Sequence, residues 1–307
     1  MSRRALLLFL LMSLIWGIPY LFIRIAVAEI SPAVLVFART GIAAVLLLPV
    51  AVARGEVGPA LARWRWVLAF AAAEVGIPWV LLGSAEERVT SALAALLVAG
   101  VPLVGTVIGI ATGSRDRVGR VGVAGLLVGL VGVAGIVGVT ADAANGTALL
   151  EIGLVVVGYA TGPAILARRL GGVPSLGVMA VSLAACAAVY APIAFLQRPA
   201  ALPGTDVFAA VAILGVVCTT FAFVLFGALV GEIGAVRATV ITYINPAVAA
   251  LLGVAVLREA FTIPMAIGFV LVILGSVLAT RMPPPAAPDG APRRAIRPLP
   301  EVDESGA

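Results

Sequence analysis

The 307 residues of this chain are enough for two ordinary soluble domains, but 62% are hydrophobic and only 11% are charged, a composition that excludes the usual soluble classes and indicates a lipid environment. The formal net charge is +5, yet the 20 basic residues, all arginines, are scattered between apolar runs, so we expect no nucleic-acid partner. The absence of lysine and histidine excludes a P-loop ATPase, a Schiff-base enzyme and imidazole-dependent sites. We therefore expect no enzymatic activity, no cofactor and no metal.

Apolar windows of membrane-spanning length follow one another along the whole chain. A bilayer core about 30 Å thick needs roughly 17 to 25 apolar residues per helix. The ten windows are Leu6 to Ala26, Ala33 to Ala53, Trp66 to Gly83, Val89 to Ala111, Val121 to Val139, Leu149 to Ala167, Leu176 to Leu196, Phe208 to Val230, Ala235 to Leu257 and Ile263 to Thr280. They predict an all-α integral membrane protein with ten transmembrane helices.

The two ends of the chain need separate interpretations. Arg3 and Arg4, followed by an apolar run and Ala26-Val27-Ala28, resemble a cleavable signal peptide, but the run is longer than the roughly 7 to 15 apolar residues of such a peptide. We therefore interpret it as the first transmembrane helix. The Pro-rich, charged segment 281–307 has too little apolar surface to order itself, which predicts a disordered cytoplasmic tail.

The distribution of arginine predicts the orientation in the membrane. If the N-terminus is cytoplasmic, 15 arginines fall in cytoplasmic segments, whereas Arg88, Arg198 and Arg258 fall outside and Arg24 and Arg39 lie within windows. Cytoplasmic segments retain positive charge during insertion. We therefore expect a multi-pass protein of the cell (cytoplasmic) membrane with both termini in the cytoplasm.

The sequence also contains an internal repeat of proline and glycine positions. A shift of 144 residues superimposes Pro19 on Pro163, Arg24 on Arg168, Gly83 on Gly227, Pro102 on Pro246 and Gly109 on Gly253, and a shift of 143 superimposes Gly125 on Gly268 and Gly132 on Gly275. The halves, residues 1–139 and 149–280, each contain five spans. Because five is odd, the second half enters the membrane inverted, an arrangement typical of transporters whose halves rock about a shared site.

The repeated prolines lie in the first and fourth helices of each half. Each proline lacks an N–H group and disturbs the turn before it, and a freed carbonyl in a bilayer needs protein or a water-filled cavity as its partner. We therefore predict breaks at Pro19, Pro102, Pro163 and Pro246 that surround a cavity. The alternative is that these prolines only kink the helices for packing.

Several motifs together resemble the EamA-type drug/metabolite transporter superfamily. They are Trp16-Gly17-Ile18-Pro19-Tyr20, Ser31-Pro32, Phe37-Ala38-Arg39, Asn245-Pro246, Leu257-Arg258-Glu259 and the segment Gly268 to Gly275. The resemblance, over roughly residues 5 to 280, implies two EamA-like five-helix repeats, alternating access and a central cavity lined largely by helices three, four, eight and nine. The first half departs from the pattern, because Ser114-Arg115-Asp116 stands where the family usually has Gly-Glu, so any role of that glutamate is present only in Glu259.

Two charged residues inside the windows are candidates for ion coupling. Glu74 is the only acidic residue well inside a window, about 12 Å past its start at 1.5 Å per residue, where an ionised carboxylate is costly. It is either a proton-coupling and substrate-binding group or a neutral acid bonded to a neighbouring helix. Arg39 matches the arginine of the family's second helix, and a structural role in which it reaches the interface or pairs with a carboxylate is the preferred alternative.

The other candidate residues flank the predicted breaks. Substrate-binding candidates are Trp16, Tyr20, Trp79, Pro102, Tyr159, Tyr243 and Asn245. The aromatic side chains could stack on a solute or belong to an interfacial belt, and the Asn245 amide could contact a solute or join helices. The glycines Gly122, Gly125, Gly129 and Gly132 instead predict close helix packing.

These observations favour a secondary transporter of small metabolites or drug-like solutes that works by alternating access, as an exporter that could be coupled to protons. Its expected partners are a small-molecule substrate and the lipid bilayer, and the oligomeric state is left open. A channel, a membrane enzyme and a non-transport scaffold are the alternatives. No carbonyl filter or carboxylate ring in the sequence favours a channel, and no cluster of reactive side chains in the windows favours an enzyme.

Overall fold

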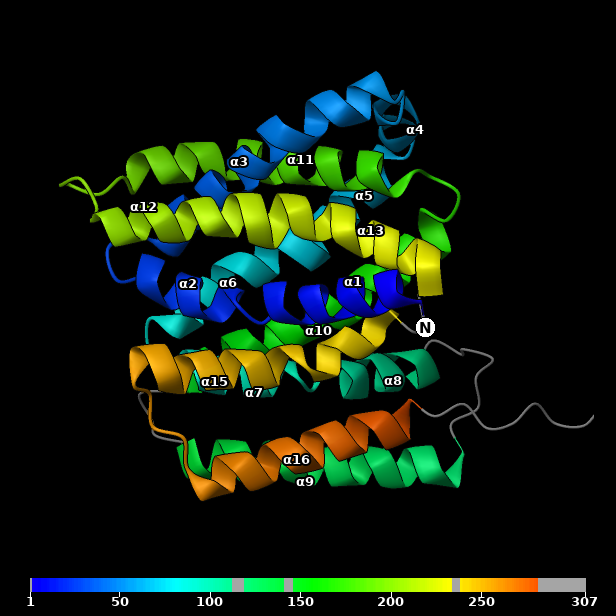
Figure 1. The fold of residues 1–307 in the computed structure, drawn as a ribbon, viewed down its shortest axis with the longest axis vertical. Helices are drawn as coiled ribbons and strands as arrows, with labels where there is room; N and C mark the ends of the chain where they lie inside the picture. Colours follow the sequence, from blue (N-terminus) through cyan, green and yellow to red (C-terminus); the bar gives the residue numbers. More distant parts are fainter. Residues whose placement is uncertain (1, 112–118, 141–145, 234–237, 281–307) are drawn as a thin grey trace, which may run out of the picture.

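A computed structural model describes residues 2–111, 119–140, 146–233 and 238–280. The predicted tail, 281–307, lies outside the described residues, as does Ser114-Arg115-Asp116. The described segments form helices that lie side by side along one common direction (Figure 1). We call the end of the bundle with the N-terminus the proximal end and the opposite end, with connections 27–31, 87–90, 197–204 and 258–262, the distal end.

The first half contains five spans, several of which consist of more than one helix. Its elements are α1 (Arg3–Ile15), α2 (Pro19–Ala26), α3 (Pro32–Ala53), α4 (Val57–Ala62), α5 (Trp64–Ala71), the π-helix η1 (Ala72–Gly76), α6 (Ile77–Glu86), α7 (Ser91–Val98), α8 (Val101–Ala111) and α9 (Arg120–Thr140). Ser31 caps α3 and Thr90 caps α7, each accepting a hydrogen bond from an N–H group in the first turn of its helix.

The second half follows the same plan in the opposite direction. Its elements are α10 (Gly146–Arg169), α11 (Ser175–Leu196), α12 (Thr205–Ala212), the π-helix η3 (Ile213–Phe221), α13 (Ala222–Ile233), the 3₁₀ helix η4 (Thr239–Tyr243), α15 (Asn245–Leu257) and α16 (Ile263–Ala279). The first span starts at the proximal end, whereas α10 starts at the distal end (Figure 1). This confirms the predicted fold class, ten helices in two inverted five-helix repeats.

The spans have the length and the surface that a bilayer requires. Eight helical stretches of the described chain are long and apolar enough to cross a membrane, and the stretches 241–257 and 263–279 are shorter apolar helices. Large apolar side chains are exposed along the spans, among them Leu7, Val45, Leu127, Val189 and Leu251. A water-soluble protein rarely leaves so much contiguous apolar surface uncovered, but lipid covers it without cost.

Three of the four predicted proline breaks are present. The first span is interrupted between Ile15 and Pro19, the fourth between Val98 and Val101, and the ninth changes from 3₁₀ to α-helix just before Pro246. The prediction at Pro163 was wrong, because α10 runs through it without interruption. A single proline removes one backbone hydrogen bond, and a transmembrane helix accommodates this loss by local adjustment.

Both third spans contain a π-helical segment that the sequence did not predict. A shift of 144 residues places η1 (Ala72–Gly76) on residues 216–220, which lie within η3. In η3 the hydroxyls of Thr219 and Thr220 each donate to a carbonyl five residues earlier, at 2.8 and 2.9 Å. π-Helical turns widen the helix locally and occur often at functional sites. The repeat is therefore conserved in backbone geometry as well as in proline and glycine positions.

Helices α9 and α16 form a pair at the edge of the bundle (Figure 1). A Cβ atom added at Gly125 would lie 2.5 Å from the Ala279 nitrogen, and one at Gly132 would lie 2.7 Å from the Gly268 carbonyl oxygen. No side chain fits in these gaps, so glycine is what allows the two backbones to touch. The close packing predicted for these glycines is confirmed.

Candidate functional site

Arg39 is the centre of a polar cluster deep between the two halves. The side chain projects from α3 and is buried. Its Nε donates to the Thr219 hydroxyl on η3, at 2.8 Å, and its guanidinium lies 3.6 Å from the centroid of the Trp79 ring on α6. Within the described part of the chain, no carboxylate lies within 4.0 Å of Arg39. A buried guanidinium held by one hydroxyl and one aromatic face keeps donor capacity for a further polar group.

The π-helix explains how Thr219 reaches this cation. Its hydroxyl donates to the Leu214 carbonyl and so turns a lone pair toward Arg39. In a regular α-helix that carbonyl, five residues earlier, would be the wrong partner. The unpredicted π segment thus fixes the partner of Arg39 across the interface between the halves.

Two tyrosines extend the cluster. Tyr159 on α10 lies near Trp79 and packs against two buried apolar clusters, one that contains Tyr20 and one that contains Trp79. Tyr20 on α2 is buried and lies within electrostatic range of Tyr159. Tyr20, Arg39, Trp79 and Tyr159, predicted separately from sequence, are therefore brought together by four different helices.

Glu74 lies at the edge of the same cluster, in η1. It is half-buried, within electrostatic range of Tyr159, and its Oε2 has no hydrogen-bond partner in the described structure. The side chain packs tightly on α10, because a Cβ atom added at Gly162 would lie 3.1 Å from both Cβ and Cδ of Glu74. Glu74 Oε2 faces a glycine of α10 and has no hydrogen bond to any described residue, and both roles predicted for Glu74 stay predictions.

The remaining candidates lie outside this cluster. Trp16 packs on α13, with ring centroids 6.2 Å from Phe223 and 4.9 Å from Phe226. Tyr243 faces α16, where its hydroxyl lies 3.1 Å from the Thr280 hydroxyl. Pro102 is half-buried near the start of α8. Their contact with a solute stays a prediction, and their observed contacts join helices.

Asn245 joins the broken first and ninth spans. With the amide oriented so that its nitrogen faces two carbonyl oxygens, it donates to Ile241 at 2.9 Å and to Ser13 at 3.0 Å. Beside it the two spans cross so closely that a Cβ atom on Gly17 would lie 2.5 Å from Val248 Cβ. Of the two roles predicted for Asn245, the structure has the helix-joining one, since the amide satisfies carbonyls near both breaks.

Glu86 is a site residue that the sequence did not identify. The apolar window ended at Gly83, but α6 continues to Glu86, whose side chain is 0% exposed. A signal for this existed, because Thr90 has the form of an N-cap for the next helix and leaves only three residues for the connection. Hydropathy therefore placed Glu86 in a loop, although its carboxyl group lies at the buried end of a helix.

Glu259, the glutamate of the Leu257-Arg258-Glu259 motif, caps a helix of the other half. Arg258 adopts a left-handed conformation, φ 55°, that ends α15 and turns the next residue toward α7. The Glu259 carboxylate then accepts hydrogen bonds from the Ser91 N–H (2.8 Å), the Ala92 N–H (2.9 Å) and the Ser91 hydroxyl (3.0 Å). A carboxylate at a helix N-terminus is stabilised by the free N–H groups and by the helix dipole.

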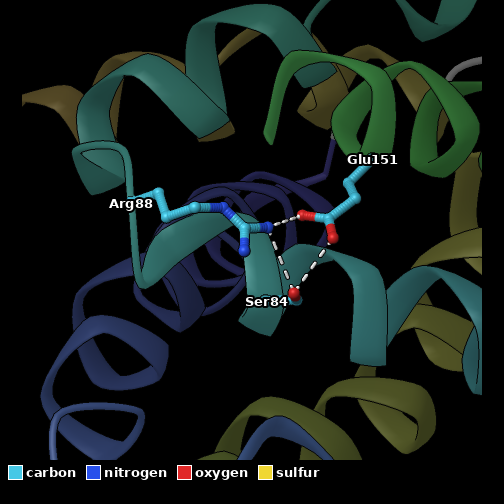
Figure 2. A network of polar contacts seen from close by, with 3 residues as sticks. All are labelled: Ser84, Arg88 and Glu151. Atoms are coloured by element: carbon cyan, nitrogen blue, oxygen red, sulfur yellow. Dashed lines mark hydrogen bonds and ion pairs between the residues drawn. The ribbon is translucent and has the colours of Figure 1, made fainter. Parts of the chain in front are cut away.

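A second polar contact joins the halves at the distal end. Figure 2 shows Arg88 and Ser84, one helical turn apart, directed at Glu151 of α10. Ser84 donates to Glu151 Oε1 at 3.0 Å, and Arg88 forms an ion pair with Oε2. The Arg88 side chain is thus bonded to a residue of α10.

Two hollows lined by described residues lie on outward faces. One, of about 690 Å³, lies along α1 beside Leu7, Leu10 and Leu14, and the other, of about 270 Å³, lies along α16 beside Ile267 and Val270. In a bilayer such apolar grooves face lipid. Among the described residues, no group of three or more His, Cys, Asp or Glu side chains is arranged to hold a metal ion.

Comparison with known proteins gives one family and one fold. The family described as "EamA-like transporter family" matches residues 3–138 and 147–281. Eight chains of solved structures match, and one of them, titled "Crystal structure of protein", has a TM-score of 0.67 and 23% identity over 91% of this chain and 98% of its own. This likeness shows the fold alone. No curated protein matches.

Proposed function

Because the chain belongs to the EamA-like transporter family and is a membrane transporter of the drug/metabolite type, we propose that it exports small metabolites or drug-like solutes across the cytoplasmic membrane by alternating access. The observation that carries this proposal is the Arg39 cluster. It lies where four helices of two inverted halves meet, and it joins the halves through the Arg39–Thr219 hydrogen bond. A site shared by two such halves is what a rocking transporter exposes alternately to each side.

The cluster has the chemistry of a solute site. Trp79 and Tyr159 offer aromatic faces and edges, and Arg39 offers the N–H groups that its bond to Thr219 leaves over. A solute with an anionic or polar group beside an apolar portion would match these groups. Glu74, on the edge of the cluster, is the proposed proton-coupling carboxyl group.

The experiment compares Arg39→Gln with Arg198→Gln, the same substitution at an exposed distal position. Metabolites would be profiled in cells that produce the wild type, each variant or no protein, after membrane levels are matched. We expect one or more metabolites to be depleted from wild-type and Arg198→Gln cells but retained in Arg39→Gln cells. Equal export by Arg39→Gln and the wild type would remove Arg39 from the solute site.

Reconstitution of the identified solute separates the transporter from the alternatives. A transporter gives flux that saturates with solute concentration and accelerates when solute is present on the opposite side. A channel gives flux without that acceleration, and a scaffold gives none.

A further inference from the structure

Glu86 is a buried carboxyl group that neither the solute site nor the Glu74 proposal uses. The side chain is 0% exposed, and in the described structure neither carboxyl oxygen has a hydrogen-bond partner. An ionised carboxylate without donors is among the most costly groups to bury, so this geometry favours the neutral acid.

The cations near Glu86 are engaged elsewhere. Arg24 of α2 donates to the main-chain carbonyl of Glu86 and not to its carboxyl group. Arg39 is held by Thr219 and Trp79, and Arg88 forms an ion pair with Glu151. Arg88 lies two positions after Glu86, beyond the last residue of α6, and its side chain is directed at Glu151 (Figure 2).

The other titratable groups within electrostatic range of Glu86 are Tyr20 of α2, Tyr159 of α10 and Glu259, which follows α15 and bonds Ser91, five positions after Glu86 in the chain. Glu259 accepts three hydrogen bonds at the start of α7, where the free N–H groups and the helix dipole favour a negative charge. Two carboxylates so placed repel each other when both are ionised. The Glu259 cap on α7 and a charged Glu86 are therefore opposed.

We propose that Glu86 is a proton-binding site that controls closure of the distal end: it is protonated while Glu259 caps α7, and its ionisation loosens that cap. This inference deepens the proposed function, because it gives a transporter a second protonation site beside its distal closure. The direction of the pH effect follows from the repulsion between the Glu86 and Glu259 carboxylates. High pH releases the proton and weakens the cap, and low pH restores it.

The experiment measures amide hydrogen exchange at the start of α7 in the purified full-length protein, at several pH values and without added solute. Wild type is compared with Glu86→Gln, which imitates the neutral acid, and with Glu87→Gln, the same change at the exposed neighbouring residue, as the matched control. Comparison at equal pH removes the intrinsic pH dependence of exchange. We expect wild type and Glu87→Gln to lose protection of the Ser91 and Ala92 amides by at least about tenfold relative to Glu86→Gln as pH rises, a lower bound because two like charges in contact inside a protein repel by more than this factor.

Identical pH dependence in wild type and Glu86→Gln would overturn the proposal. If the Glu86→Gln protein does not fold, a second measurement tests the proposal. The infrared carbonyl band of a protonated carboxylic acid should shift in Glu86→Asp and persist in Glu74→Gln, and a band unaffected by Glu86→Asp would also overturn it. Neither measurement uses a solute, so failure of this inference leaves the proposed transport activity intact, and failure to find a solute leaves this inference intact.

Discussion

The cap that Glu259 places on α7 gives a prediction whose magnitude follows from the structure. Glu259→Ala removes two hydrogen bonds from backbone N–H groups and one from the Ser91 hydroxyl. Loss of an N-cap costs about 0.5 to 2 kcal/mol, and a partly buried N–H group left without a partner costs about 1 to 3 kcal/mol. Thr90 still bonds the Leu93 N–H, which limits the damage to the first turn. We therefore expect a loss of about 2 to 4 kcal/mol in the free energy of unfolding.

The assay is thermal unfolding of the purified protein in detergent, with hydrogen exchange in α7 as the local readout. The matched control is Glu29→Ala, because Glu29 is exposed at the same end and accepts one backbone hydrogen bond, from Gly204 at 2.7 Å. The control should lose less than about 1.5 kcal/mol. Equal losses for the two variants, or normal protection of α7 in Glu259→Ala, would refute the reasoning.

Three further predictions concern coupling, packing and orientation. Glu74→Gln keeps the shape of the neutral acid but releases no proton, so uptake driven by a pH gradient should fall severely while solute exchange survives. Normal gradient-driven uptake by this variant in proteoliposomes would end the coupling hypothesis. Gly132→Ala should lower the free energy of unfolding by about 1 to 3 kcal/mol in a thermal unfolding assay, because the new Cβ would lie 2.7 Å from a carbonyl oxygen of α16. Gly138→Ala, whose Cβ would meet nothing within 4 Å, should leave the free energy of unfolding nearly unchanged. Reporters fused after Arg169 should be active only in the cytoplasm and those near Asp206 only outside, and the reverse result would invert the predicted orientation.

Hydropathy predicted the ten spans because a bilayer leaves a helix few alternatives: each span must satisfy its own backbone and be apolar over about 30 Å. The inverted repeat followed from proline and glycine positions, since these residues constrain the backbone wherever they occur. The break predicted at Pro163 was wrong, because α10 tolerates the one missing backbone hydrogen bond. Neither π segment was predicted, because the same apolar residues can form a helix with either α-helical or π-helical hydrogen bonds.

The candidate site was only partly predictable, and Glu86 shows why. Hydropathy treats the sequence Glu86-Glu87-Arg88 as one polar break, but the three side chains have different surroundings. Glu86 is buried at the end of α6, where Arg24 of α2, distant in sequence, bonds its main-chain carbonyl. Arg39 was found from its depth in a window, whereas its partner Thr219 depended on the π-helix of the other half.

Exposed ion pairs and carboxylate–backbone hydrogen bonds join the spans at the ends of the bundle. At the proximal end the Arg4–Glu232 ion pair, 3.3 Å long, has side chains that are 73% and 27% exposed, and exposed pairs contribute only about 0 to 1 kcal/mol. At the distal end Glu259 bonds the backbone of α7, and Arg88 and Ser84 both bond Glu151, in partly buried surroundings.

Hydrogen bonds between a carboxylate and backbone N–H groups contribute more than solvated ion pairs, and both ends have such a bond, because Glu56 at the proximal end accepts one from the Gly177 N–H at 3.1 Å. In the proposed cycle the distal contacts are those that must break before the Arg39 cluster opens to that side. The buried Glu86 carboxyl group lies within electrostatic range of Glu259, which caps α7 from the other half. Under the Glu86 proposal the strength of that cap depends on the charge of one side chain, which would give a proton a direct way to act on the cycle.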